Sequence, residues 1–139
     1  MIVLDTNVLS EVLRPAPERR VMAWLDGQPQ ASVFTTAVTL GEILYGIRLM
    51  PDGQRRKKLW DAATVIFTDD FAGRVLSFDE DAASDYAEIA ASRRAAGRPI
   101  SQFDGVIASI TRSRGAILAT RNAKDFEGCG MEVVNPWLE

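Results

Sequence analysis

Short apolar segments alternate with helical patterns along the chain, and this alternation constrains the fold more than any other feature. Most runs rich in Ile, Val and Leu are followed by a helical pattern that a Gly or Pro ends. This order predicts a parallel sheet covered by helices on both faces, because each parallel strand needs a crossover to the next. We therefore predict one α/β domain over residues 1–139, a three-layer α/β/α sandwich with a mostly parallel central sheet.

The same patterns predict the bounds of the individual elements. Strands are expected at residues 2–4, 32–35, 75–78, 117–120 and 131–134. Helices are expected from about residue 7 to 14, and at 18–26, 38–47, 54–65, 80–96 and 101–114. In sheets of this kind, ligands bind beyond the carboxyl ends of the strands, so the residues that follow each strand are the first candidates for a site.

The composition constrains the cellular compartment in which the protein is expected and the partners that it can bind. The 16 Lys and Arg against 19 Asp and Glu give a net charge of −3, so no overall basic field attracts nucleic acid, although a local basic patch would suffice. The single cysteine, Cys129, forms no internal disulfide, and a reduced, cytoplasmic protein is expected. Asp5 interrupts the first apolar run, and no stretch approaches the ~20 apolar residues that span a bilayer, so neither a signal peptide nor membrane contact is expected.

The chain contains no histidine. This excludes Ser–His and Cys–His nucleophiles as well as zinc held by histidine. The glycine-rich patterns that bind dinucleotides or nucleotide phosphates are also missing. The remaining chemistry is that of carboxylates, which bind hard cations such as Mg²⁺ or Mn²⁺ when several of them gather at one point.

Four acids occupy the positions at which such a site would form. Asp5 follows the first predicted strand, and Asp125 follows the strand at 117–120. Asp104 opens a helix that enters the sheet from the same edge, and Glu42 lies in the first half of its helix among apolar neighbours. All four can therefore face one crevice, although they are far apart in the sequence.

Each acid also has a purely structural interpretation. Asp5 could cap the helix that follows it, and Ser101-x-x-Asp104 before an apolar run is typical of a capping box. Glu42 could be a solvated helix residue, and Asp125 a loop acid or a cap. Among the basic residues, Arg98, Arg112 and Arg121 are candidates to rim the site and contact phosphates.

Five segments together resemble the PIN-domain family, in particular the VapC-type toxins of bacterial toxin–antitoxin pairs and their FitB-like branch. The segments are IVLDTNVLSE at 2–11, TLGEILYG at 39–46, DGVIA at 104–108, ATRN at 119–122 and NPW at 135–137. A single one of these segments would be unspecific, but their order and spacing span nearly the whole chain. The resemblance implies an α/β/α sandwich and a magnesium-dependent endoribonuclease in which Mn²⁺ can replace Mg²⁺.

The resemblance also assigns residues. Asp5, Glu42 and Asp104 match the three acidic positions of the family, whereas the fourth position corresponds either to Asn122 or to Asp125. We favour Asp125 as the charged contributor and Asn122 as a neutral ligand or orienting residue. Three further residues are assigned supporting roles: Thr6 and Asn7 would support the first acid, and Thr120 would hydrogen-bond a ligand water.

The implied partners are RNA, a small antitoxin and a second copy of the chain. The resemblance further implies a larger toxin–antitoxin oligomer that binds promoter DNA. An inhibitor could block an acidic site by inserting a basic side chain, and an amphipathic helix could grip an apolar groove nearby. The residues of the early helices predicted to form that groove are Val8, Leu9, Val12, Leu13, Val21 and Trp24.

Two other functions are compatible with this sequence. A metal-dependent phosphatase would also place an acid after the first strand, but it usually needs a second acid two residues later, where this chain has Asn7. A catalytically inert PIN-like regulator that binds nucleic acid or an antitoxin is the main alternative. Cleavage of RNA in magnesium, and its loss in EDTA, would separate an enzyme from such a regulator.

Overall fold

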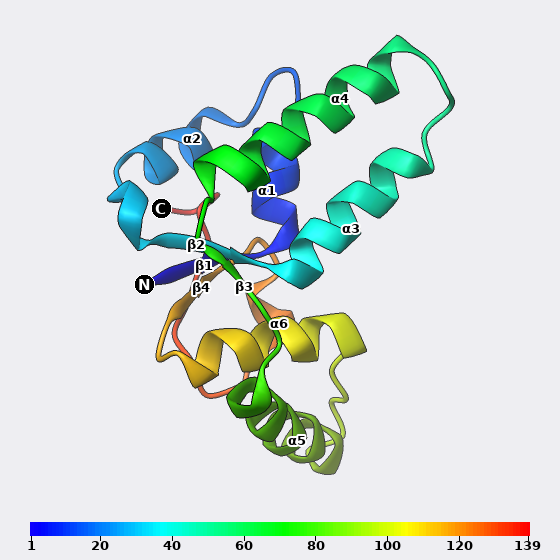
Figure 1. The fold of residues 1–139 in the computed structure, drawn as a ribbon. Helices are drawn as coiled ribbons and strands as arrows, with labels where there is room; N and C mark the ends of the chain where they lie inside the picture. Colours follow the sequence, from blue (N-terminus) through cyan, green and yellow to red (C-terminus); the bar gives the residue numbers. More distant parts are fainter.

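The computed structural model describes all 139 residues and has a five-stranded central sheet (Figure 1). The strands are β1 (Ile2–Leu4), β2 (Val33–Thr36), β3 (Val75–Leu76), β4 (Ile117–Ala119) and β5 (Val133–Val134). Their order in the sheet is β3-β2-β1-β4-β5, and every neighbouring pair is parallel. The predicted sheet is confirmed and is wholly parallel.

Six α-helices cover the two faces of the sheet. They are α1 (Thr6–Val12), α2 (Arg19–Asp26), α3 (Ala37–Arg48), α4 (Gln54–Val65), α5 (Glu80–Ala95) and α6 (Gln102–Ser113). In Figure 1 the first four lie above the sheet, and α5 and α6 lie below it. The three-layer sandwich predicted from the sequence is therefore confirmed, with both chain ends at the left of the view.

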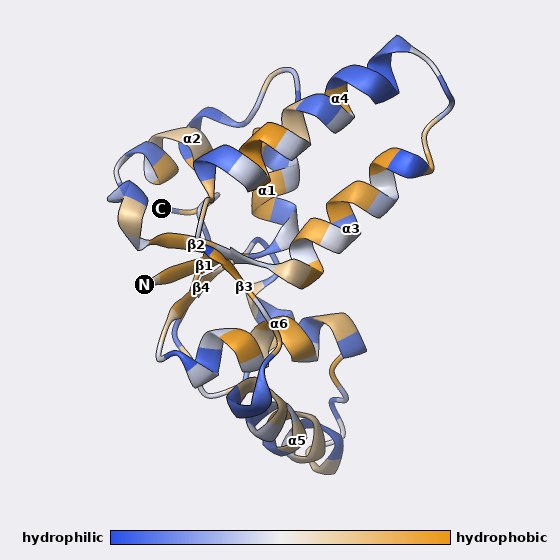
Figure 2. Cartoon of the chain, in the orientation of Figure 1, coloured by the Kyte–Doolittle hydropathy of each residue, from blue (hydrophilic) through white to orange (hydrophobic).

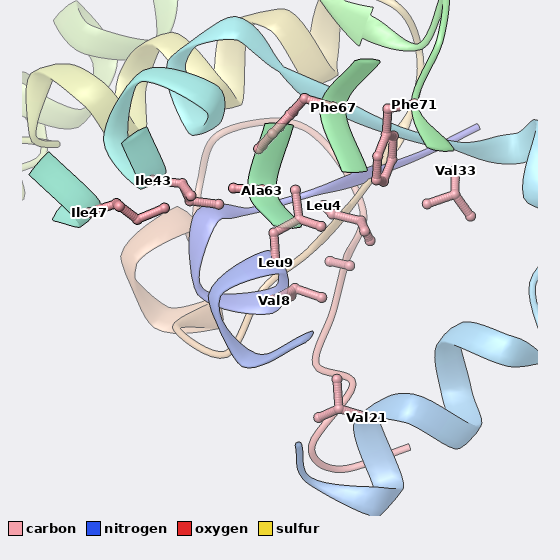
Figure 3. Close-up of a cluster of buried hydrophobic side chains, with 11 residues drawn as sticks. Leu4, Val8, Leu9, Val21, Val33, Ile43, Ile47, Ala63, Phe67 and Phe71 are labelled. Atoms are coloured by element: carbon pink, nitrogen blue, oxygen red, sulfur yellow. The ribbon is translucent and has the colours of Figure 1, made fainter. Parts of the chain in front are cut away.

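The strands alternate their side chains between two hydrophobic cores. In β1, Leu4 packs into the core under α1–α4, whereas Val3 packs into the core over α5 and α6. In β4, Ala119 packs into the core under α1–α4, and Leu118 packs into the core over α5 and α6. Figure 2 shows the hydrophobic strands in the middle and the hydrophilic first turns of α4 at the periphery, and Figure 3 shows Leu4 among the side chains of the upper core. Burial on both faces explains why these strands read as continuous apolar runs.

Several element ends follow the capping chemistry seen in the sequence. Asp79 accepts a hydrogen bond from the Ala82 N–H at 2.9 Å at the start of α5, and Ser101 accepts one from the Asp104 N–H at 3.3 Å at the start of α6. Behind Asp104, Gly105 allows α6 to approach α5 closely, because an added Cβ would lie 2.9 Å from a ring carbon of Tyr86. The capping role of Ser101 and the glycine contact fix the helix end that carries Asp104.

Some predicted bounds were wrong. Helix α1 ends at Val12 instead of residue 14, since the residue before Pro15 disfavours helical backbone. Strand β3 stops at Leu76 because its partner β2 ends at Thr36, opposite Leu76. Beyond it, Phe78 packs edge-on against Tyr86, with ring centroids 6.1 Å apart. The sequence also did not predict that α4 continues into a π-helical turn over Ile66–Asp70. None of the helices is long and apolar enough to cross a bilayer.

The order of the strands makes the carboxyl edge of the sheet the candidate site. From β1 the chain proceeds to β2 and β3 on one side, and later to β4 and β5 on the other. The strand order therefore reverses beside β1, where the loops after β1 and β4 diverge to opposite layers and leave a crevice. Helix α3 starts at this edge because it follows β2, and α6 starts there because it leads into β4.

Candidate active site

A cleft of about 490 Å³ lies at the carboxyl edge of the sheet, where β1 and β4 end. Its lining residues come from the ends of both strands, from three helices and from the C-terminal turn. They are Asp5, Thr6, Asn7, Ser10, Glu11, Arg14, Glu42, Asp104, Arg121, Asn122 and Trp137. Three of the four predicted acids therefore converge on one cleft.

Asp5 is the buried centre of the acid cluster. It is only 5% exposed, and its carboxylate accepts hydrogen bonds from the Thr6 N–H at 2.8 Å and the Thr120 hydroxyl at 2.8 Å. Burial raises the pKa of Asp5 from 3.8 to about 6. These two hydrogen bonds oppose the rise, and the charges of Asp104 and Glu42 add to it. The cap predicted for Asp5 is confirmed, but a cap alone does not require a buried acid beside two others.

A chain of hydroxyl groups orients Glu42. The Thr6 hydroxyl donates to the Glu42 carboxylate at 2.8 Å and lies 3.0 Å from the Thr39 hydroxyl. Thr36 in turn donates to Thr39 at 3.3 Å. Since each hydroxyl carries one proton, a single direction from Thr36 through Thr39 and Thr6 to Glu42 satisfies every contact. Thr6 therefore joins α1 to α3 and supports Glu42 as well as Asp5.

Thr120 and Asn7 hold the end of β4 against Asp5. The Thr120 hydroxyl donates to Asp5 and accepts from the Asn7 amide at 3.2 Å and the Asn122 N–H at 3.1 Å. The Asn7 amide also donates, at 3.3 Å, to the Asp5 oxygen that accepts from Thr120. Asn7 and Thr120 thus support Asp5 directly, whereas the sequence interpretation had assigned Thr120 to a ligand water.

Asp104 lines the cleft, and Asp125 lies close enough to influence its pKa. Asp104 is half-buried, and burial raises its pKa, with the negative charge of Asp125 adding to the rise. Asp125 lies in a short 3₁₀ helix, Ala123–Phe126, and is exposed. It does not line the cleft, whereas Asn122 does. The structure therefore brings Asp125 near Asp104 but not into contact with the space between Asp5 and Glu42.

The three predicted RNA-contacting arginines occupy different environments. Arg121 lines the cleft, is exposed, and lies with its guanidinium carbon 5.1 Å from the centre of the Trp137 ring. Arg98 pairs with Glu127 at 3.0 Å outside the cleft. Arg112 pairs with Glu88 at 2.7 Å and does not line the cleft, because the contact between α5 and α6 engages its side chain.

The sequence did not predict that Glu11 and Arg14 form an ion pair in the cleft. Glu11 is 4% exposed, and it accepts hydrogen bonds from Arg14 at 3.1 Å and from the Glu18 N–H at 3.0 Å. The Glu18 N–H lowers the pKa of Glu11. The signal used for Glu42, an acid between apolar neighbours, was also present at Glu11, between Leu9 and Val12.

Arg93 was also missed as a structural residue. Its buried guanidinium donates to the carbonyl oxygens of Asp125 at 2.8 Å and Glu127 at 3.1 Å, and its Nε donates to the Arg98 carbonyl at 2.7 Å. It thereby ties the loop that carries Asp125 to the end of α5. No pattern in the sequence distinguishes Arg93 from the exposed Arg94 beside it.

The donor atoms of the cleft suit a hard divalent cation. As the side chains lie, no group of three acids, histidines or cysteines is arranged to hold a metal ion. The groups that line the cleft between Asp5, Glu42 and Asp104 nevertheless offer carboxylate, amide and hydroxyl oxygens, which Mg²⁺ and Mn²⁺ prefer. The raised pKa values of Asp5 and Asp104 indicate that a positive charge between them would be stabilising.

A longer groove continues from the cleft. It has a volume of about 700 Å³ and is lined by residues of α1, α3 and α4, including Leu13, Ile43, Ile47 and Leu59, and it shares Glu42 with the cleft. Of the residues predicted to form a groove on the early helices, Leu13 lines this one, and Leu9 and Val12 line a separate pocket of about 390 Å³. Figure 3 shows Val8 and Val21 in the core, where both are fully buried.

Comparison with known proteins shows the family of the chain. The family model described as PIN domain matches residues 2–128. The chain is 39% identical over 137 residues to VapC ribonuclease Y4jK of Sinorhizobium fredii, covering 99% of this chain and 98% of the relative. It is also 39% identical over 137 residues to Toxin FitB of Neisseria gonorrhoeae, covering 99% of both chains.

A solved structure of FitAB bound to an IR36 DNA fragment contains a chain of the same fold. The two chains align with a TM-score of 0.93 and 39% identity, covering 99% of this chain and 96% of the other. The match by the family model and these relatives, which extend over nearly the full length, show that the chain belongs to the PIN-domain family, among the VapC-type and FitB-type toxins.

Proposed function

We propose that the protein is a magnesium-dependent endoribonuclease and the toxin of a toxin–antitoxin pair, acting in the cytoplasm. The observation that carries the proposal is the convergence of Asp5, Glu42 and Asp104, from three separate elements, on one cleft without histidine. The similarity to a VapC ribonuclease and to Toxin FitB supports the reaction and the biological role.

The acids have complementary roles in the proposed reaction. A bound Mg²⁺, which Mn²⁺ could replace, would polarise the scissile phosphate and lower the pKa of a water molecule. Asp5 is the most rigid ligand, since Thr6 and Thr120 fix both of its oxygens. Glu42, oriented through Thr6, and Asp104, on the first turn of α6, would hold the cation from the other two sides.

Asp125 and Asn122 are the two candidates for the fourth position of the site. We assign Asp125 as a charge that adds to the attraction for the cation through its proximity to Asp104, and Asn122 as a neutral oxygen ligand or orienting group. If this assignment is right, Asp125→Asn should weaken the affinity for magnesium, measured as the concentration that gives half-maximal cleavage. Asn122→Ala should lower cleavage even at saturating magnesium. The reverse pattern would exchange the two roles.

The direct test is cleavage of single-stranded RNA in magnesium or manganese against EDTA. Asp5→Asn, Glu42→Gln and Asp104→Asn should each abolish cleavage while the circular dichroism spectrum stays native. The matched control is Asp81→Asn, since Asp81 is an exposed acid on α5 that does not line the cleft. Full activity of the wild type in EDTA would refute the metal-dependent reaction.

The inert regulator is the alternative that the same assay separates. A regulator would bind RNA or its protein partner without cleaving RNA in any divalent cation, and the three substitutions would leave binding of the partner unchanged. The presence of all three acids at the cleft favours the enzyme, because carboxylates held together without a cation repel each other and destabilise the fold.

We further propose an antitoxin that occupies the groove between α1, α3 and α4, a homodimer of this chain, and a larger complex that binds promoter DNA. The solved FitAB complex bound to DNA supports this assembly. The groove and the cleft share Glu42, so an antitoxin helix lying in the groove could reach the cleft with a basic side chain that replaces the cation.

Co-expression with the neighbouring small gene tests the partner. We expect relief of toxicity and co-purification of the two proteins. Gly46→Arg should abolish co-purification, because Gly46 is an exposed residue of the groove with open space above it, and a long charged side chain there would fill the groove. A complex that forms equally well with Gly46→Arg would place the antitoxin elsewhere.

A further inference from the structure

Arg121 is the arginine of the cleft that forms no ion pair. Two arginines line it, Arg14 and Arg121. The guanidinium of Arg14 pairs with Glu11 at 3.1 Å, whereas none of the ion pairs in the protein involves Arg121. An exposed guanidinium that forms no direct ion pair, on the lining of an acidic cleft, is available to an anion that approaches the acids.

The backbone of Arg121 is fixed on both sides. Its N–H donates to the Asn7 side-chain oxygen at 3.2 Å, and its carbonyl oxygen accepts from the Asn135 amide at 3.3 Å. Asn7 and the preceding Thr120 are the same residues that hold Asp5. The position of Arg121 relative to the acid cluster is therefore set by hydrogen bonds on both sides of its backbone.

Trp137 supports the guanidinium. It is the one hydrophobic residue that lines the cleft, and the guanidinium carbon of Arg121 lies 5.1 Å from its ring centre, within the range of a cation–π contact. The Trp137 N–H donates to Asn135 at 2.9 Å, and its carbonyl oxygen accepts from Arg20 at 3.3 Å. Asn135 thus holds both Arg121 and Trp137, and the C-terminal turn forms one wall of the cleft.

We propose that Arg121 binds a phosphate of the RNA next to the scissile one, and that Trp137 is a positioning residue that holds its guanidinium toward the cleft. This inference rests on the proposed ribonuclease function. Each neighbouring phosphate of RNA brings a negative charge toward Asp5, Glu42 and Asp104. A metal ion among the acids would not contact these neighbouring phosphates. A cation on the rim of the cleft therefore offsets their repulsion by the acids. Stacking on the indole limits the rotamers of Arg121, so less freedom is lost when the phosphate binds.

The experiment uses a short fluorescein-labelled single-stranded RNA and the full chain. Binding is followed by anisotropy over a series of salt concentrations in EDTA, and KM and kcat are measured for cleavage of the same RNA in magnesium. Arg121→Gln should reduce the slope of log K against log salt by about 0.7, the value for one phosphate contact with a single strand, and weaken binding about fivefold at 0.1 M salt. KM should rise by a similar factor with kcat near that of the wild type.

The matched control is Arg94→Gln. Arg94 is an exposed arginine on α5 that forms no ion pair and does not line the cleft. This variant should leave the salt slope and KM unchanged. If Arg121→Gln behaves like Arg94→Gln while the wild type cleaves RNA, the inference alone is overturned. A wild type that neither binds nor cleaves the RNA overturns the proposed ribonuclease and this inference together.

A double-mutant cycle tests the role of Trp137 apart from its effect on folding. Trp137→Leu should raise KM, and Trp137→Phe, which keeps an aromatic face, should restore most of the loss. If Trp137 acts through Arg121, Trp137→Leu should add little to the KM of Arg121→Gln. Independent, additive effects on log KM would overturn the positioning role. All assays are run below the melting temperature of each variant, so that unfolding does not enter the comparison.

Discussion

The raised pKa of Asp5 predicts that the protein without metal becomes less stable as the pH rises. Burial raises the pKa of Asp5 from 3.8 to about 6 in the native state. Between these two values the native protein keeps a proton that the unfolded chain has already released, so the unfolding free energy falls with increasing pH. The difference of about two pH units corresponds to a loss of about 3 kcal/mol, which is complete above the native pKa.

Asp5→Asn isolates this contribution, because the amide does not titrate. The variant also changes the hydrogen bonds, since the new NH₂ group faces either Thr6 N–H or the Thr120 hydroxyl, both of which donate to Asp5. This mismatch should cost about 1–3 kcal/mol, but at every pH alike. The stability of the variant relative to the wild type should therefore rise by about 3 kcal/mol from about pH 3 to about pH 8, whatever the constant offset.

Urea denaturation followed by circular dichroism measures this difference. Wild type and Asp5→Asn are unfolded at a series of pH values in EDTA, and the difference between their unfolding free energies is plotted against pH. Other carboxylates titrate in both proteins and largely cancel. Saturating magnesium should stabilise the wild type more than the variant and remove most of its loss at neutral pH. A difference that stays constant with pH would refute the claim that Asp5 carries an unfavourable buried charge.

Three further outcomes follow from the same contacts. Magnesium should raise the melting temperature of the wild type more than that of Asp104→Asn, by differential scanning fluorimetry, and equal shifts would exclude Asp104 as a ligand. Thr120→Val removes a hydrogen bond to Asp5 and should lower both RNA cleavage and the unfolding free energy, the latter by about 2 kcal/mol in urea; unchanged cleavage would contradict its supporting role. Arg93→Met leaves three carbonyl groups without their donor and should destabilise the protein by about 3 kcal/mol, whereas Arg94→Met, beside it, should be nearly neutral.

The sequence by itself determined the elements and the class of fold. Helix α4 was predicted with its observed bounds, and α2 and α5 to within a residue, because periodicity and the Gly or Pro that ends a helix are local properties. The cap at Ser101 was predicted for the same reason. The alternation of strands and helices implied a parallel sheet, and a parallel sheet implied that residues after its strands would meet at one edge.

Only the tertiary structure decided which of these residues share the cleft. The strand order places β1 between β2 and β4, and this neighbourhood brings Thr120 within 2.8 Å of Asp5 across more than a hundred residues. It also places Asn122 in the cleft and Asp125 outside it, although the two lie three residues apart. Hydrophobic periodicity predicts which face of a helix or strand a residue occupies. Which element packs against that face depends on the crossovers and on packing between distant segments of the chain. For this reason the contact of Arg121 with Trp137, which joins the end of β4 to the C-terminal turn, could be found only in the folded chain.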